Sequence, residues 1–171
     1  MVLTRTTLLV RASTLWLLLG AGCGAPNALP GTALGTFAVT GVLSSNTCGS
    51  GLKPTNPWKF EAELSLDGNT LYFKPADQDE VSAPIDSENA ATFTSVANSE
   101  AATDSACSLS LKSTYTVQLD SNTAPTTGSG SLRFEYSAVR NSTCASQLTE
   151  NGGKYDELPC AVVFSYTALK K

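Results

Sequence analysis

Hydrophobic and polar residues alternate with a period of two along most of this chain, which is the pattern of β-strands that bury one face. The clearest stretch is 58–66, in which every even position is apolar and every odd position is polar. Asp67-Gly68 follows, and this dipeptide supports the backbone angles of a two-residue hairpin turn. We therefore predict a hairpin in which Leu64 faces Leu71. The same register places Ala62 opposite Phe73, Glu63 opposite Tyr72 and Glu61 opposite Lys74.

Four other segments alternate in the same way and predict strands at 35–43, 107–119, 131–138 and 160–168. Shorter candidate strands lie at 81–85 and 91–96, a turn or two of helix is expected at most at 98–105, and a long loop is expected at 121–129. The residues expected to point inward in the four segments are Phe37, Val39, Leu109, Leu111, Ser113, Tyr115, Val117, Leu119, Leu132, Phe134, Tyr136, Ala138, Val162, Phe164, Tyr166 and Ala168.

About eight strands are expected, nearly all antiparallel, and each must bury its apolar face against another part of the sheet. We predict an all-β fold in which an up-and-down meander closes into a barrel, with a β-sandwich as the second choice. Lys59, Glu61 and Glu63 occupy the outer face of 58–66, which does not fit the apolar belt of a membrane-spanning barrel. Gly35-Thr36-Phe37 resembles the Gly-x-Trp start of lipocalins, with Phe in place of Trp, and this resemblance implies a lipocalin-like barrel.

Residues 1–22 have the layout of a secretory signal peptide. Arg5 and Arg11 form its positive region, an apolar run from Leu15 to Leu19 follows, and small residues end the segment. The uncharged stretch 12–22 is about half as long as the roughly 20 residues that a membrane-spanning helix needs. We therefore expect residues 1–22 to be removed and not to remain as a transmembrane helix.

The end of this segment, Leu19-Gly20-Ala21-Gly22-Cys23, resembles the lipobox of bacterial lipoproteins, with Gly20 where Leu is commonest. The resemblance implies cleavage before Cys23, acylation of that cysteine and anchorage in a bilayer, whereas the alternative is an ordinary signal peptide with an unmodified Cys23. Gly24 is not the Asp that retains many enterobacterial lipoproteins at the inner membrane, so the resemblance implies the outer membrane. The expected organisation is 1–22 as signal peptide, 23–34 as lipidated cysteine and flexible tether, and 35–171 as a single β domain.

The other cysteines, Cys48, Cys107, Cys144 and Cys160, are even in number, which in an exported chain predicts two disulfides. Four cysteines allow three pairings. We favour Cys144 with Cys160, because these two bracket a polar loop between strong strand patterns. That choice leaves Cys48 with Cys107.

The net charge of the chain is −4, and it becomes −6 when Arg5 and Arg11 are removed with the signal peptide. An acidic surface disfavours nucleic acid and anionic lipid as direct partners. The chain contains no histidine, which excludes Ser-His-Asp and Cys-His catalysis and weighs against a zinc site. We therefore expect no cofactor and no resident metal.

Three patterns have a chemical interpretation and a simpler structural one. Glu61 and Glu63 are paired carboxylates, but nearby lysines favour a solvated sheet face over acid–base catalysis. Gly128-Ser129-Gly130-Ser131 lacks the lysine and the helix of a phosphate-binding loop. An acidic run offers oxygen ligands for Ca²⁺ without the spacing of a calcium loop, which favours a charged loop. Its residues are Asp77, Asp79, Glu80, Asp86 and Glu88.

The sequence favours a non-enzymatic lipoprotein of the cell envelope that acts through its surface. Its expected contacts are the lipid bilayer, through Cys23, and an envelope protein. The alternative is a carrier-type barrel that holds a small, mostly apolar ligand in its open end. In that case the residues lining or filling the interior would be Phe60, Leu64, Leu71, Phe73, Tyr115, Phe134, Tyr136, Phe164 and Tyr166.

Overall fold

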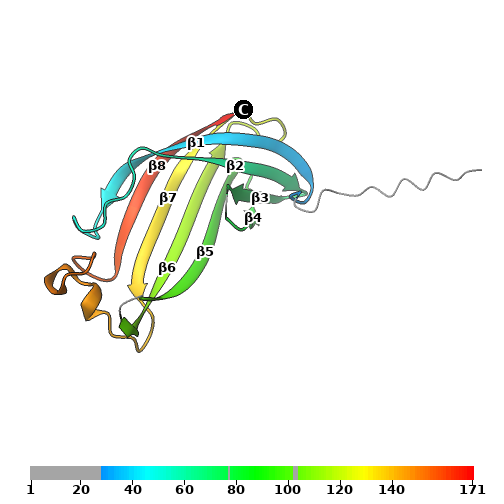
Figure 1. The fold of residues 1–171 in the computed structure, drawn as a ribbon. Helices are drawn as coiled ribbons and strands as arrows, with labels where there is room; N and C mark the ends of the chain where they lie inside the picture. Colours follow the sequence, from blue (N-terminus) through cyan, green and yellow to red (C-terminus); the bar gives the residue numbers. More distant parts are fainter. Residues whose placement is uncertain (1–27, 77, 102–103) are drawn as a thin grey trace, which may run out of the picture.

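Eight antiparallel strands form one sheet that curls into a nearly closed barrel (Figure 1). This computed structural model describes residues 28–76, 78–101 and 104–171, so the predicted signal peptide and Cys23 lie outside the described residues. No helix in the described part is long and apolar enough to cross a membrane. The strands are β1 (Thr32–Asn46), β2 (Trp58–Asp67), β3 (Thr70–Pro75), β4 (Val81–Pro84), β5 (Ala90–Ala101), β6 (Asp104–Leu119), β7 (Thr127–Ala138) and β8 (Cys160–Lys170). Two short 3-10 turns, η1 (Ala145–Gln147) and η2 (Thr149–Asn151), lie between β7 and β8.

The strand order is β4-β3-β2-β1-β8-β7-β6-β5, so two four-stranded meanders are joined by the pairing of β1 with β8. The predicted antiparallel all-β barrel is confirmed. Its two edge strands are β4 and β5, which follow each other in the sequence but form no ladder with each other in the described sheet. We call the line along which these two edges meet the seam.

Side chains alternate across the sheet, and the inward set forms the core of the barrel. Phe37, Val39 and Leu132, all predicted to point inward, are at most 3% exposed. Ser65 is an exception, because its odd position predicts an outward side chain and the structure buries it. Its hydroxyl donates a hydrogen bond to the Pro30 carbonyl at 2.6 Å, so the segment before β1 packs on β2.

The barrel begins earlier in the chain than predicted, because β1 starts at Thr32 and not at Gly35. A β-bulge between Ala33 and Gly35 shifts the register of β1 against β2. The bulge interrupts the alternation, so Leu34 is buried although Phe37 and the other inward residues of this strand occupy odd positions. A period-two pattern does not extend across such an interruption. The predicted tether, 23–34, therefore extends too far along the chain, because residues 32–34 belong to β1.

The predicted hairpin of β2 and β3 is present, but its turn lies one residue later. Gly68-Asn69 forms the turn, and Leu64 faces Phe73 where Leu71 was predicted. Gly68 has a φ of 57° at the first turn position, where type II′ turns place glycine. The register differs by two residues, so the predicted inner and outer faces are kept. Leu66 now lies opposite Leu71.

Strands extend into two segments where the sequence predicts other structure. The predicted helical turn at 98–105 is wrong, because β5 runs through Ala101 and β6 begins at Asp104. Polar residues of β5 are held there by the ladder to β6, in which Asn98 lies opposite Ser110. The predicted loop at 121–129 is shorter, because β7 starts at Thr127.

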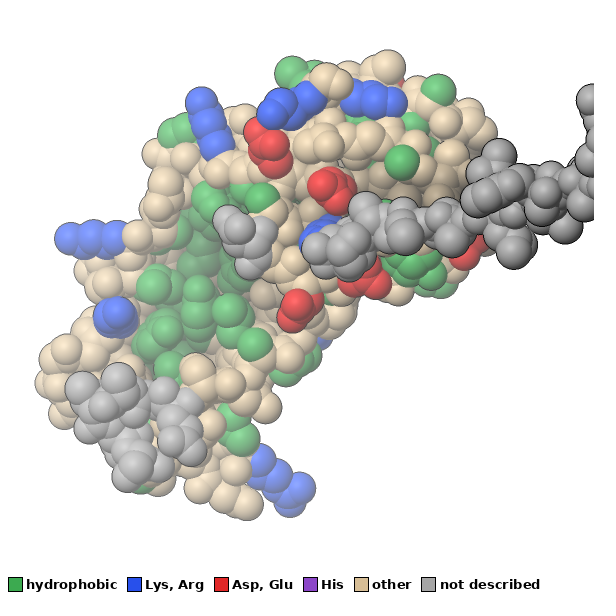
Figure 2. Space-filling view, turned by 45° about the vertical axis from the view of Figure 1, so that its right-hand side comes forward, with side chains coloured by type: hydrophobic (Ala, Val, Ile, Leu, Met, Phe, Trp, Pro, Cys, Tyr) green, Lys and Arg blue, Asp and Glu red, His purple; other side chains and the backbone are tan. Residues whose placement is uncertain are grey.

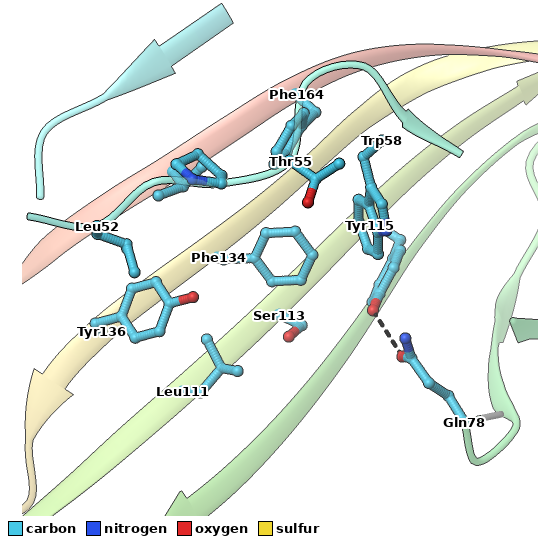
Figure 3. A pocket seen from close by; sticks show the side chains of 12 residues that line it. Leu52, Thr55, Trp58, Gln78, Leu111, Ser113, Tyr115, Phe134, Tyr136 and Phe164 are labelled. Atoms are coloured by element: carbon cyan, nitrogen blue, oxygen red, sulfur yellow. Dashed lines mark hydrogen bonds between the residues drawn. The ribbon is translucent and has the colours of Figure 1, made fainter. Parts of the chain in front are cut away.

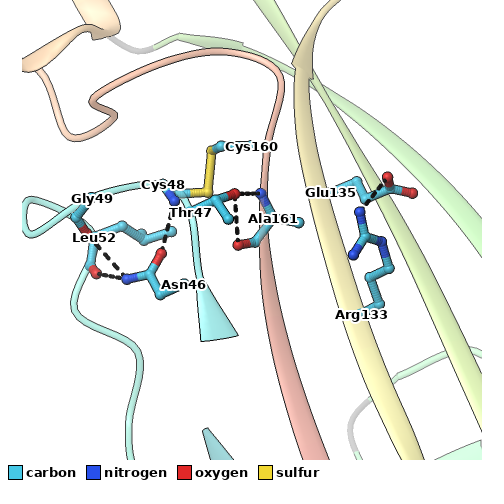
Figure 4. Close-up of a disulfide and its surroundings, with 9 residues drawn as sticks. All are labelled: Asn46, Thr47, Cys48, Gly49, Leu52, Arg133, Glu135, Cys160 and Ala161. Atoms are coloured by element: carbon cyan, nitrogen blue, oxygen red, sulfur yellow. Dashed lines mark hydrogen bonds and ion pairs between the residues drawn. A yellow bond between two sulfur atoms is a disulfide. The ribbon is translucent and has the colours of Figure 1, made fainter. Parts of the chain in front are cut away.

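Two disulfides join the four expected cysteines, but the predicted pairing is wrong. Cys48 bonds to Cys160, shown in Figure 4, and Cys107 bonds to Cys144. The end of β1 pairs with the start of β8, which brings the first two cysteines together. The start of β6 pairs with the end of β7, which does the same for the other two. Each bond therefore joins one strand to the loop that follows its neighbouring strand, whereas the prediction assumed that cysteines at the two ends of one loop bond to each other.

Candidate functional site

A cavity of about 410 Å³ opens on the inner face of the barrel. In this part of the barrel, β6, β7 and β8 extend beyond the short strands β3 and β4 (Figure 1). β6 has 16 residues and β4 has 4, so part of the inner face has no strand opposite it. Figure 2 shows hydrophobic side chains gathered in a hollow of the surface. The residues that line the cavity are Leu52, Pro54, Thr55, Trp58, Gln78, Leu111, Ser113, Tyr115, Phe134, Tyr136, Val162 and Phe164.

Aromatic rings form a continuous part of the cavity wall (Figure 3). The ring centroid of Phe134 lies 6.3 Å from those of Tyr115 and Phe164. Trp58 of β2 packs against the same group, 5.5 Å from Phe134 and 5.7 Å from Phe164. These edge-to-face and tilted contacts are favourable arrangements for aromatic pairs. The rings therefore support one another as one packed wall.

Few polar groups reach the cavity, and none of its described lining residues is charged. The Tyr115 hydroxyl donates a hydrogen bond to Gln78 Oε1 at 3.2 Å. Burial raises the pKa of Tyr115, against the smaller opposing effect of a hydrogen bond with Ser113, and burial also raises the pKa of Tyr136. An ordinary tyrosine has a pKa of about 10, so both phenols are neutral at physiological pH. The cavity therefore presents an uncharged, largely apolar surface.

The segment 47–57, between β1 and β2, covers one side of the cavity and is held in place at its start. The Cys48–Cys160 disulfide ties it to β8. Asn46 Nδ2 donates to the carbonyls of Gly49 and Leu52, both at 3.1 Å, and Asn46 Oδ1 accepts from the Cys48 amide at 2.9 Å (Figure 4). Three of the lining residues belong to this segment, namely Leu52, Pro54 and Thr55.

Of the nine interior residues expected for a ligand-binding barrel, Tyr115, Phe134, Tyr136 and Phe164 line the cavity. Sequence reasoning missed Gln78 and the residues of segment 47–57, because nothing in a loop sequence shows which part of a barrel it covers. Trp58 could have been predicted as a lining residue, because it belongs to the apolar face formed by the even positions of 58–66. The remaining expected residues belong to the core or pack against it, and they are Phe60, Leu64, Leu71, Phe73 and Tyr166.

The described acidic residues that were singled out in the sequence are not among those that line the cavity. Glu61 and Glu63 are exposed on the outer face of β2, and Lys171 Nζ lies 2.6 Å from Glu61 Oε1. Asp77 lies outside the described residues. In 28–76, 78–101 and 104–171, no three His, Cys, Asp or Glu side chains lie close enough together to hold a metal ion. The exposed members of the acidic run are Asp79, Glu80, Asp86 and Glu88.

The cavity has the volume and the mostly apolar lining of a small-molecule site. Such sites typically have volumes of about 300–1,000 Å³ and mostly apolar linings. Comparison of the chain with protein-family models, with curated proteins and with solved structures finds no match. The candidate site therefore rests on the geometry and chemistry of the cavity.

Proposed function

We propose that this protein binds a small, largely apolar molecule in the cavity and performs no chemistry on it. The observation that carries this proposal is a cavity of about 410 Å³ with aromatic walls and no charged side chain in its described lining. Burying apolar ligand surface contributes about 25 cal/mol per Å². Packed rings and a tethered loop also lose little conformational entropy on binding, which leaves more of that gain as affinity.

The proposed location is the bacterial outer membrane. Two disulfides indicate the oxidising environment that exported proteins meet. We propose that the lipobox-like segment is cleaved and that Cys23 is acylated, which would hold the barrel at the bilayer. Residues 24–31, between Cys23 and β1, reach at most about 29 Å when fully extended. The cavity would therefore stay close to the membrane surface.

Ligand binding is tested with N-phenyl-1-naphthylamine, a neutral aromatic probe, added to the full chain in lipid nanodiscs. Trp58 lies in the cavity wall, and Trp16 is the only other tryptophan of the chain. Energy transfer from Trp58 to bound probe therefore reports occupancy of the cavity, and empty nanodiscs supply the blank. We expect saturable transfer.

Two leucine-to-lysine variants separate binding in the cavity from binding elsewhere. Leu52→Lys places a charge against the apolar wall and should weaken probe binding at least tenfold, because an unpaired charge is costly to desolvate. Leu169→Lys changes a β8 side chain that is 61% exposed and outside the cavity lining, so the affinity should stay unchanged. Absence of saturable transfer, or equal affinity in wild type and Leu52→Lys, would contradict the proposal.

Anchorage is tested separately, by mass spectrometry of the protein extracted from bacterial membranes. The denatured mass should lack residues 1–22, include acyl chains on Cys23 and be smaller than that of the reduced chain by the hydrogens lost in two disulfides. An intact, unmodified Cys23 would remove the anchor from the proposal without affecting ligand binding.

A surface-interaction role in the envelope is the second candidate. Its support is the outer edge of β5, 12 residues long, which pairs with no strand in the described sheet. Exposed edges allow another chain to add a strand. Recovery of a stable partner from gentle membrane extracts at native abundance would favour this role, and recovery of free monomer would count against it.

A further inference from the structure

A second cavity, of about 740 Å³, lies along the seam and adjoins the first; we call it the seam groove. Gln78 and Tyr115 line both cavities, and the hydrogen bond between them marks the place where the two meet (Figure 3). The groove exists because β4 begins only at Val81, whereas β5, which starts beside the Pro84 end of β4, continues past Val81 through Ala101. Its lining residues are Lys74, Pro75, Gln78, Asp79, Val81, Ser95, Val96, Ala97 and Tyr115.

The two cavities share a continuous floor on the inner face of β5 and β6. Ser95 of the groove lies directly opposite Ser113 of the first cavity, and Ala97 lies opposite Leu111. Residues paired in this way have Cβ atoms about 4.5–5.5 Å apart. Ser95 and Ala97, at the boundary between the two cavities, have small side chains.

The two cavities differ in chemistry. The first has aromatic walls and no charge in its described lining, whereas the described lining of the groove includes Lys74 and Asp79. One cation and one anion give the groove no preference for an ionic group of either sign. Together with the amide of Gln78 and the hydroxyl of Ser95, they supply hydrogen-bond donors and acceptors. A neutral head group rich in hydroxyls can accept hydrogen bonds from these donors and donate hydrogen bonds to these acceptors.

We infer that the cavity and the seam groove are two halves of one site, and that its ligand is a single-chain amphiphile with a neutral, hydroxyl-rich head. This inference rests on the proposed function. The apolar chain of the ligand lies among Trp58, Phe134 and Phe164, and its head lies in the groove between Lys74 and Ser95. Gln78, which is exposed at the junction, meets the first polar atoms of the head.

The test uses octyl β-glucoside below its micelle concentration and 1-octanol, each displacing N-phenyl-1-naphthylamine from the full chain in nanodiscs. Both compounds have the same apolar chain, so a difference in affinity at equal free concentration reports the head. We expect the glucoside to bind at least tenfold more tightly. Ser95→Phe fills the groove and should abolish this preference. Thr94→Phe is the matched control, because Thr94 is the adjacent hydroxyl residue, is also exposed and points to the outer face.

The outcomes separate this inference from the proposed function. Equal affinity for glucoside and octanol in the wild type, with the probe still bound, would overturn the inference and leave the proposed function standing. A tenfold preference that persists in Ser95→Phe would also overturn it. Loss of the preference in Ser95→Phe, with its retention in Thr94→Phe, would support it. A wild type that binds no probe would overturn both.

Discussion

Tyr166 of β8 donates a hydrogen bond from its phenol to the backbone carbonyl of Thr116 in β6, at 2.9 Å, across the intervening strand β7. The ring passes over Gly130, which pairs directly with Tyr166 in the ladder. The amide of Ser131, which lies opposite Thr116 in the ladder, donates to Thr116 Oγ1 at 2.9 Å. Burial raises the pKa of the Tyr166 hydroxyl well above its ordinary value, so it stays a donor.

Gly130→Ala should destabilise the barrel by about 2 kcal/mol, within the range for overpacked sites. A Cβ at this position would collide with the Thr116 carbonyl oxygen and lie 3.0 Å from the Tyr166 ring. Both neighbours are held by the hydrogen bond between them, so neither can move freely. Urea unfolding of the oxidised protein measures the change.

Gly128→Ala is the control, because Gly128 also lies in β7 and faces the core. The nearest atom to its added Cβ is Leu119 Cδ2, at 3.2 Å, the flexible end of a side chain. We expect a loss below about 1 kcal/mol. If both variants lose the same free energy of unfolding, the close approach of Tyr166 is not what requires glycine at 130.

Removing the two disulfides should have different effects on the cavity. The chain-entropy model gives about 5 kcal/mol for Cys48–Cys160, which spans 112 positions, and about 4 kcal/mol for Cys107–Cys144, which spans 37. Only the first bond ties down the segment that carries Leu52. Replacing Cys48 and Cys160 by serine should therefore weaken probe binding more than replacing the other pair.

Peptide mapping of the oxidised protein checks the pairing itself and should recover these two linkages and no others. Probe titrations are made below the unfolding midpoint of each variant, so that loss of affinity is not loss of fold. Equal losses of affinity in the two serine variants would show that the first disulfide does not hold the cavity wall.

Asp120 should make stability depend on pH in the acid range. Its Oδ2 accepts a hydrogen bond from the Thr126 hydroxyl at 2.6 Å, and this bond is the largest cause that lowers its pKa to about 2. Backbone amides of Thr126 and Thr127 add to the effect. The pKa is below the unfolded value of about 3.9, so the stabilisation is complete above about pH 4 and disappears as the pH falls through 2.

An NMR titration of the Asp120 carboxyl carbon measures this directly. In Thr126→Val the hydroxyl is absent and the backbone amides remain, so the pKa should rise toward its ordinary value. The acid loss of stability should then become smaller. A wild-type carboxyl that titrates near pH 4 would contradict the prediction.

Replacing both Glu61 and Glu63 by glutamine should leave probe binding unchanged. Among the described residues, Glu61 forms an ion pair with Lys171, and both side chains of this pair are about half exposed. Exposed pairs contribute about 0–1 kcal/mol, so the free energy of unfolding should change by no more than that. A large loss of binding would point instead to a role for the outer face of β2.

The strands that could be predicted from the sequence are those with one buried and one wet face. In β6, alternation from Leu109 to Leu119 identifies the inner face, because each core position is apolar or small. The same rule gives no signal at Asn98, where polar residues form a strand through their partner. It also fails at Leu34, where a bulge interrupts the period.

The cysteine pairing and the full lining of the cavity could not be predicted, because both depend on which strands become neighbours. Periodicity describes each strand alone and carries no information about the pairing of β1 with β8. That pairing brings Cys48 to Cys160 and carries segment 47–57 over the inner face. Gln78 is a similar case, since the length of β3 and β4 decides where their loop lies.

The position of β8 between β1 and β7 affects the order in which the barrel folds. In this order β8 completes the middle of the sheet, and its ladder to β1 is the pairing most distant in sequence among the described strands. Such non-local pairings form slowly, because a long stretch of chain must be closed first. Before that ladder forms, the two meanders can form separately, each with an uncovered central edge. The edge of β1 therefore remains open to wrong partners until β8 pairs with it.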